Sequence, residues 1–270
     1  MGSEPEIVGA GCSFAWELPI LPGMDPIIDN EPLPGEPPAV TLSRRQRLLQ
    51  RIGSFYGISF GIAMLMLSLF SWLAQEVLEQ EFAEVNRAIL LWIHSFTSPT
   101  LTTLAFAFTG LGSVIGVVVL ALCFGMLLLR MRHYWDMVVL AVVLIGGALL
   151  VFVLKNVFQQ IRPDVFTPLA VELNFSFPSG HSLISFCFWG FFSAWLIRQN
   201  PRELWRWIAG MLGLAMAALV ALSRLYLGVH WPTDVLAGML VATFWVTACL
   251  SGHRWLTDRR ARRISAGAVI

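Results

Sequence analysis

Six apolar segments, each close to the about 20 residues that an α-helix needs to cross a membrane, dominate this 270-residue chain. They fall at 52–74, 111–129, 136–157, 180–197, 204–222 and 233–250. Hydrophobic residues make up 57% of the chain and charged residues only 13%, whereas soluble domains carry about 25% charged residues. The sequence therefore predicts an all-α polytopic membrane protein whose six transmembrane helices form a bundle.

The segments outside the apolar spans have their own character. Residues 1–43 are rich in proline, glycine and acidic residues, which predicts a flexible tail. This tail lacks the basic start and apolar core of a cleaved signal peptide. The six-span membrane domain is expected at 44–254, followed by a basic cytoplasmic tail at 255–270. Segment 82–98 has apolar residues at helical spacing, typical of an interfacial amphipathic helix, and 99–110 either extends the second span or forms a short interfacial helix.

The placement of the arginines predicts which side of the membrane domain faces the cytoplasm. Arginines gather in four segments, 44–51, 130–132, 198–206 and 254–263. A six-span topology puts all four on one side, which the positive-inside rule makes cytoplasmic. Both termini are then cytoplasmic, and the protein is expected in the cell's inner membrane. A net charge of +1 and the absence of a large basic patch give no reason to expect a nucleic-acid partner.

Among the cations that lie against this bias, at the outer face, are Arg162, Arg224 and Lys155, the single lysine of the chain. Charges near a bilayer are costly and usually functional. Lys155 and Arg162 are seven residues apart, close to two helical turns, so we expect them on one helix face, with Pro163 ending the helix. The alternative is a pair of cations that snorkel from a helix end.

The stretch FPSGHS, residues 177–182, predicts a helix start. Ser179 is a good N-cap for the fourth span, and Gly180 lets a ligand approach the backbone. The free N–H groups of this helix would then form an anion site beside His181 in the first turn. The alternative is an ordinary capped helix with an interfacial histidine.

A second histidine lies at the start of the sixth span. His230 precedes Asp234 by four residues, and Pro232 suits the first turn of the helix between them. The carboxylate can accept a hydrogen bond from one imidazole nitrogen, which leaves the other nitrogen free as a nucleophile. Taken alone, the pair could equally be a structural cap.

Taken together, three cations, a helix N-terminus and two histidines at one membrane face favour a phosphate ligand. Two histidines suit a nucleophile and a general acid. No carboxylate cluster is available to hold a metal, because Asp164 and Glu172 are isolated in the sequence. We therefore expect phosphoryl transfer without metal or cofactor, in which the cations neutralise the developing charge.

The three segments resemble the signature of the type-2 phosphatidic acid phosphatases. Lys155 is followed after six residues by Arg162-Pro163, then by Pro178-Ser179-Gly180-His181, and then by Ser223-Arg224 with His230 and Asp234. This family shares a superfamily with bacterial class A acid phosphatases and vanadium haloperoxidases, and the chain resembles its bacterial membrane-bound type. The motifs cover about 80 residues, and the joint pattern is far more specific than any one part.

The resemblance implies a role for each residue. His230 would attack phosphorus to form a phosphohistidine, Asp234 would orient it, and His181 would protonate the leaving oxygen and then activate water. The phosphate oxygens would be held by Lys155, Arg162, Ser179, Gly180 and Arg224. The implied substrates are membrane lipids that carry phosphate, such as phosphatidate, phosphatidylglycerophosphate or undecaprenyl diphosphate, with no metal required.

Other functions are compatible with parts of the pattern. A lipid phosphotransferase would use the same phosphohistidine, whereas the haloperoxidases of the superfamily are soluble. A transporter or scaffold would be expected to carry its charges near the membrane midplane. The outer connections 159–178 and 223–232 are too short for a lid domain, which favours lateral access of substrate from the bilayer. The residues specify neither the lipid nor an oligomeric state.

Overall fold

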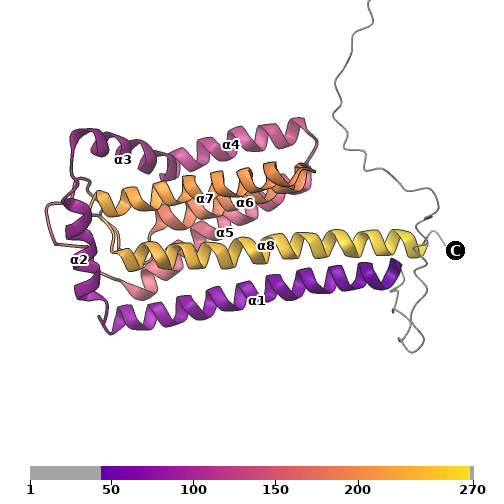
Figure 1. Ribbon diagram of the computed structural model, residues 1–270, viewed down its shortest axis with the longest axis horizontal. Helices are drawn as coiled ribbons and strands as arrows, with labels where there is room; N and C mark the ends of the chain where they lie inside the picture. The colour runs from indigo at the N-terminus through magenta and orange to yellow at the C-terminus, as the bar shows by residue number, and fades with distance from the viewer. Residues whose placement is uncertain (1–43, 268–270) are drawn as a thin grey trace, which may run out of the picture. The chain divides into compact units, whose positions relative to one another are not determined.

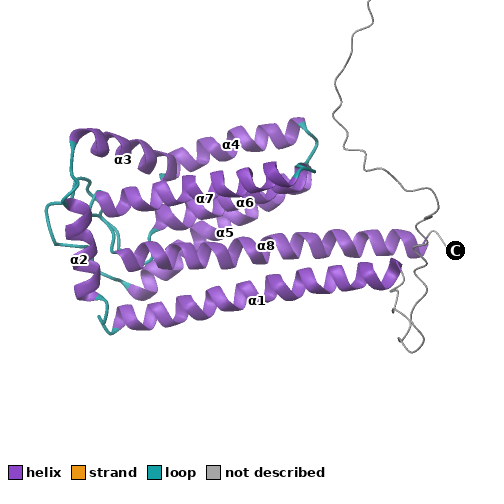
Figure 2. Ribbon diagram, viewed as in Figure 1, coloured by secondary structure: helices purple, strands orange, loops and turns teal. Residues whose placement is uncertain are grey.

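The computed structural model describes residues 44–267, and all regular structure in that range is α-helical (Figure 2). The predicted tail at 1–43 lies outside the described residues. The helices are α1 Arg44–Leu78, α2 Ala83–His94, α3 Pro99–Gly112, α4 Val114–Arg130, α5 Tyr134–Phe158, α6 Gly180–Gln199, α7 Glu203–Tyr226 and α8 Pro232–Gly267. The residues from Arg47 onward form one compact unit.

Five of the described helices are long and apolar enough to cross a membrane, namely α1, α5, α6, α7 and α8. Helices α3 and α4 make a sixth span if the two are counted together, with a bend of 58° between them. The all-α six-span prediction is thereby confirmed. Figure 1 shows the long helices side by side, with α2 crossing one end of the bundle. There Nδ2 of Asn86 donates to Oγ1 of Thr233 at 3.0 Å, which ties α2 to α8.

The bend between α3 and α4 has a local cause. Ser113 is extended, with φ −67° and ψ 161°, and its hydroxyl accepts from the backbone N–H of Gly116 to start α4. A Cβ on Gly116 would lie 2.0 Å from the carbonyl oxygen of Gly110, so only glycine fits this turn. A Cβ on Gly112 would lie 2.2 Å from Cγ1 of Val220, which shows how closely α3 meets α7. The bend therefore depends on a serine cap and small residues.

Helix α6 lies at the centre of the packing and contacts α5, α7 and α8. Its buried face includes Leu183, Cys187 and Phe191, each fully shielded from solvent. Phe124 of α4 packs its ring edge-on against Trp195 of α6, with ring centroids 5.2 Å apart. Because α6 is held on several sides, its first turn has a fixed position at the end of the bundle that carries α2 (Figure 1).

The arginine-rich segments meet at the opposite end of the bundle, where α4 ends, α5 begins, α6 meets α7 and α8 runs out (Figure 1). At that end the buried carboxylate of Asp136 accepts from Arg198 at 2.7 Å and lies 2.9 Å from Nδ1 of His133. Helix α8 continues to Gly267, through most of the segment that the sequence assigns to a C-terminal tail.

The contact of α6 with α7 allows a direct test, because this contact positions His181 and Arg224. A Cβ on Gly213 would lie 2.9 Å from the backbone oxygen of Trp189 and would collide with the Ser193 hydroxyl. We expect Gly213→Ala to destabilise the protein by about 1–3 kcal/mol, since an overpacked helix contact must shift. A thermal melt in detergent measures the loss.

The matched control is Gly210→Ala on the same helix. A Cβ there would meet Ile197 at 3.8 Å, an ordinary van der Waals contact. We expect this variant to melt at or above the wild-type temperature, because alanine favours helix over glycine. Equal melting temperatures for the two variants would contradict the packing argument.

Candidate active site

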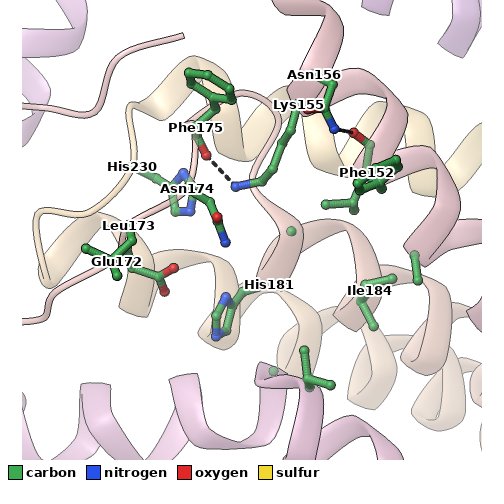
Figure 3. A pocket seen from close by; sticks show the side chains of 15 residues that line it. Phe152, Lys155, Asn156, Glu172, Leu173, Asn174, Phe175, His181, Ile184 and His230 are labelled. Atoms are coloured by element: carbon green, nitrogen blue, oxygen red, sulfur yellow. Dashed lines mark hydrogen bonds between the residues drawn. The ribbon is translucent and has the colours of Figure 1, made fainter. Parts of the chain in front are cut away.

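A cavity of about 530 Å³ opens at the end of the bundle crossed by α2. Helices α5 and α6, the connection 159–179 and the turn before α8 contribute its polar wall, whose residues include Lys155, Glu172, Asn174, His181 and His230 (Figure 3). The structure thus brings both predicted histidines and the predicted lysine to one cavity. Gly180 lines the same cavity.

His230 is held in one orientation by a carboxylate. Its Nδ1 lies 3.2 Å from Oδ2 of Asp234, as the spacing predicted. The same oxygen accepts from the hydroxyl of Ser176 and, at 2.8 Å, from the backbone N–H of Trp231. Asp234 is 0% exposed and His230 1%. The second ring nitrogen, Nε2, lies 3.4 Å from Nη1 of Arg162.

Arg162 reaches this position from a loop and not from a helix, so the expected shared helix face is wrong. Helix α5 ends at Phe158, because Gln159 adopts the left-handed conformation with φ 48° and ψ 32°. The chain then turns, and Arg162 donates from Nε to the carbonyl of Asn174 at 2.6 Å and from Nη1 to that of Val229 at 2.6 Å. Tertiary contacts, and not helical spacing, therefore position this guanidinium.

Lys155 meets Arg162 at a shared acceptor. The Lys155 ammonium donates to the carbonyl oxygen of Phe175, which also accepts from Nη2 of Arg162 at 3.3 Å. A carbonyl orients these two cations without cancelling their charge. The two side chains predicted to act together are thus adjacent, although the reason for their adjacency differs from the prediction.

Arg224 lies deeper than the other cations, with only 2% of its side chain exposed. Its Nη1 donates to the hydroxyl of Thr109 on α3, and its Nη2 pairs with Oε1 of Glu172. The other carboxylate oxygen of Glu172 lies 3.5 Å from Nη2 of Arg162. Glu172 therefore bridges two arginines that are predicted to bind phosphate, whereas in the sequence it stands apart from other carboxylates.

The first turn of α6 has the expected cap. Ser179 is the N-cap residue, and its hydroxyl accepts from the backbone N–H of Ser182 at 3.5 Å and from the Ser182 hydroxyl at 3.0 Å. The backbone N–H of Ser179 donates to the carbonyl of Asp234 at 3.0 Å, which joins α6 to α8. A Cβ on Gly180 would lie only 3.2 Å from Val151, so glycine here permits close packing on α5.

The sequence reasoning missed three polar side chains of the site, Thr109, Glu172 and Ser176. Ser176 lies two residues before the cis peptide bond that leads into the helix cap, and a polar residue beside that motif was the available signal. For Glu172 the signal was charge balance, because three cations at one apolar face need a counterion. No sequence pattern identifies Thr109 as a site residue, because it lies 115 residues from its partner Arg224 in the chain.

The electrostatic setting keeps His230 neutral. Burial lowers the pKa of His230 well below the ordinary 6.5, and the charges of Arg162, Arg224 and Lys155 lower it further, against a smaller opposing effect of Glu172. A neutral imidazole has a lone pair on one ring nitrogen. The arrangement can thus present an unprotonated nitrogen to an anion that the nearby cations attract.

The described residues thus form a helical membrane bundle with a cavity at one end that two histidines and a lysine line. Residues 136–258 match the model of the PAP2 superfamily, a range that contains every predicted site residue. This part of the chain is therefore similar to the PAP2 superfamily.

Two curated relatives match this chain over part of its length. Phosphatidylglycerophosphatase B of Bacillus subtilis is 40% identical over 112 residues, which are 40% of this chain and 53% of the relative. Undecaprenyl-diphosphatase of Sulfolobus acidocaldarius is 39% identical over 98 residues, which are 34% of this chain and 43% of the relative. The chain thus spans about half the length of the curated relatives it matches.

A solved structure extends the likeness to the fold. The crystal structure of a transmembrane PAP2-type phosphatidylglycerolphosphate phosphatase from Bacillus subtilis superposes with a TM-score of 0.67 at 28% identity. The match covers 71% of this chain and 96% of that chain. The similarity therefore includes nearly the whole of the solved bundle.

The protonation state of His230 can be measured. We expect the ring to stay neutral at about pH 6, where an ordinary histidine of pKa about 6.5 is mostly charged. Because only the unfolded chain then takes up the proton, the free energy of unfolding should fall as the pH falls below about 6.5. Carbon-13 NMR of labelled histidine follows the titration, and His230→Asn assigns the signal. A midpoint at or above the ordinary value would contradict the burial argument.

Proposed function

We propose that the protein is a metal-independent lipid phosphatase that removes phosphate from a membrane lipid through a phosphohistidine at His230. One observation carries the proposal: His230 has Nδ1 on the Asp234 carboxylate and Nε2 beside Arg162, in a cavity that Lys155 and His181 also line. The printed names of the relatives, phosphatidylglycerophosphatase and undecaprenyl-diphosphatase, support a phosphorylated lipid as substrate.

In the first step, Nε2 of His230 attacks phosphorus while the bond to the lipid oxygen breaks. Asp234 accepts from the protonated Nδ1 and stabilises the positive charge that develops on the ring. His181, the other histidine of the cavity, gives its proton to the leaving oxygen. The products of this step are the dephosphorylated lipid and a phosphorylated His230.

In the second step, water replaces the lipid. His181, now neutral, takes a proton from the water, whose oxygen attacks phosphorus as the bond to Nε2 breaks. Inorganic phosphate is released, and His230 is again neutral with its hydrogen on Nδ1. The same two histidines therefore serve both half-reactions, with the protons balanced over the cycle.

The cations stabilise the charge on the phosphoryl oxygens in both transition states. The Lys155 ammonium is held by a backbone carbonyl, so its positive charge remains available to an anion, whereas Arg162 donates to backbone carbonyls and also faces the Glu172 carboxylate. Arg224 pairs with Glu172, which lines the cavity. Ser179 and Gly180 at the start of α6 would contribute the dipole of the helix N-terminus.

A lipid fits the shape of the cavity. Its other wall is apolar and comes from Val114, Ala148, Val151, Phe152 and Ile184. Val114 is 82% exposed and Phe152 66%, so this wall reaches the lipid-facing side of the bundle between α4 and α5. A headgroup can then enter sideways while its chains stay in hydrocarbon. With the arginine-rich end cytoplasmic, the site lies at the outer face of the inner membrane.

The central test removes each histidine. We expect His230→Ala and His181→Ala to lower phosphate release from lipid vesicles by about 10³-fold or more, because a nucleophile and a general acid are lost. EDTA should leave wild-type turnover unchanged, and orthovanadate should inhibit it. Acid-labile phosphate on the protein, absent in His230→Ala, would identify the intermediate.

The matched control is His253→Ala, at the opposite end of the bundle in α8. This variant should keep wild-type turnover. Full activity of a correctly folded His230→Ala protein would reject the assignment. Phosphorylated product from an added lipid alcohol would show transfer in place of hydrolysis.

Lateral access makes a separate prediction. Ala148→Trp fills the apolar wall between α4 and α5, so we expect about tenfold lower kcat/KM for a long-chain lipid phosphate, with little change for water-soluble p-nitrophenyl phosphate. The control is Ala141→Trp, which is exposed on the same helix face two turns away from the cavity. Equal losses on both substrates would argue for entry from the aqueous side.

A further inference from the structure

Glu172 occupies the place where the proposed reaction needs a phosphate. It lies in the connection between α5 and α6, and its carboxylate points into the cavity between His230 and His181 (Figure 3). One oxygen pairs with Nη2 of Arg224, and the other lies 3.5 Å from Nη2 of Arg162. The two arginines assigned to the substrate thus already hold an anion of the protein itself.

Glu172 is the counterion of the buried Arg224. The Arg224 side chain is 2% exposed, and a buried guanidinium without a partner is strongly destabilising. Burial alone would raise the pKa of Glu172, but the charges of Arg224 and Arg162 lower it, and the pKa lies below the ordinary 4.5. Glu172 is therefore ionised at neutral pH and balances the arginine charge.

The carboxylate satisfies this anion site incompletely. Nε of Arg224 is buried and has no hydrogen-bond partner among the described residues. A carboxylate offers two oxygens, and both are already directed at Nη2 atoms. A tetrahedral oxyanion offers more oxygens and can take up a further guanidinium donor. The unused donor thus points to a ligand with more oxygens than Glu172 supplies.

Glu172 and a phosphate cannot share these arginines. Two anions within a few ångströms repel each other. Binding of phosphate must therefore displace the carboxylate, and loss of phosphate lets it return. Glu172 competes with every phosphate that enters the cavity, because the competition is for the arginines and does not involve the lipid chain.

We propose that Glu172 is a specificity-determining residue, a built-in competitor for the arginine pair that weakens the binding of free inorganic phosphate. This inference rests on the proposed function. Lipid phosphate and inorganic phosphate meet the same competition, but only the lipid offsets it by chain contacts along the apolar wall. The released product is thus expelled while the substrate still binds.

The test compares anion binding in three proteins. Glu172→Gln keeps the shape and an acceptor oxygen but removes the charge. We expect inorganic phosphate and orthovanadate to bind about tenfold more tightly to this variant by isothermal titration calorimetry, as the loss of one charged competitor implies. Inorganic phosphate should also become a stronger inhibitor of lipid hydrolysis by the same factor.

The matched control is Asp164→Asn, which removes an exposed carboxylate from the same connection away from this cavity. Its affinity for phosphate should equal that of wild type. Glu172→Asp, which keeps the charge but is too short to bridge both arginines, covers the case in which the glutamine variant does not fold. It should also bind phosphate more tightly than wild type does.

The outcomes separate the two proposals. Unchanged or weaker phosphate binding in the folded Glu172 variants, with measurable binding in wild type, would overturn the competitor role and leave the phosphatase proposal intact. Absence of phosphate and vanadate binding in every protein, wild type included, would overturn the proposed function and this inference with it.

Discussion

The guanidinium of Arg224 is buried at the end of α7, and its charge is balanced by the carboxylate of Glu172. This pair links the connection between α5 and α6 to the end of α7, because Glu172 lies in that connection. The same connection supplies the carbonyls of Asn174 and Phe175 that hold the other two cations. One connection therefore supplies partners for all three cations of the proposed phosphate site.

The type of acceptor matters as much as the distance. Backbone carbonyls orient Lys155 and Arg162 and carry no net charge, so Lys155 keeps its attraction for an incoming anion, whereas Arg162 also faces the carboxylate that pairs with Arg224. His230 has a charged partner instead, because the carboxylate of Asp234 faces its Nδ1. The proposed phosphate-binding cations and the proposed nucleophile thus have different kinds of partner, and both kinds lie at the same end of the bundle.

The bundle gives these side chains a rigid base. Helix α6 is packed on several sides, and its cap is linked to α8 through the bond from Ser179 to Asp234. Small residues allow the close approaches, as at Gly213 against the backbone of Trp189 and at Gly180 against Val151. A shift of any of these helices would move a histidine or an arginine relative to the others.

The sequence by itself determined the six spans, the cap at Ser179 and the pairing of His230 with Asp234. Hydropathy follows directly from the solvent that a span must face, and capping and four-residue spacing are local geometry. Only the tertiary structure decided that Arg162 leaves the helix of Lys155 and that Glu172 bridges two arginines. Those contacts join residues far apart in the chain, and their energy depends on burial and on neighbouring charges that no local pattern encodes.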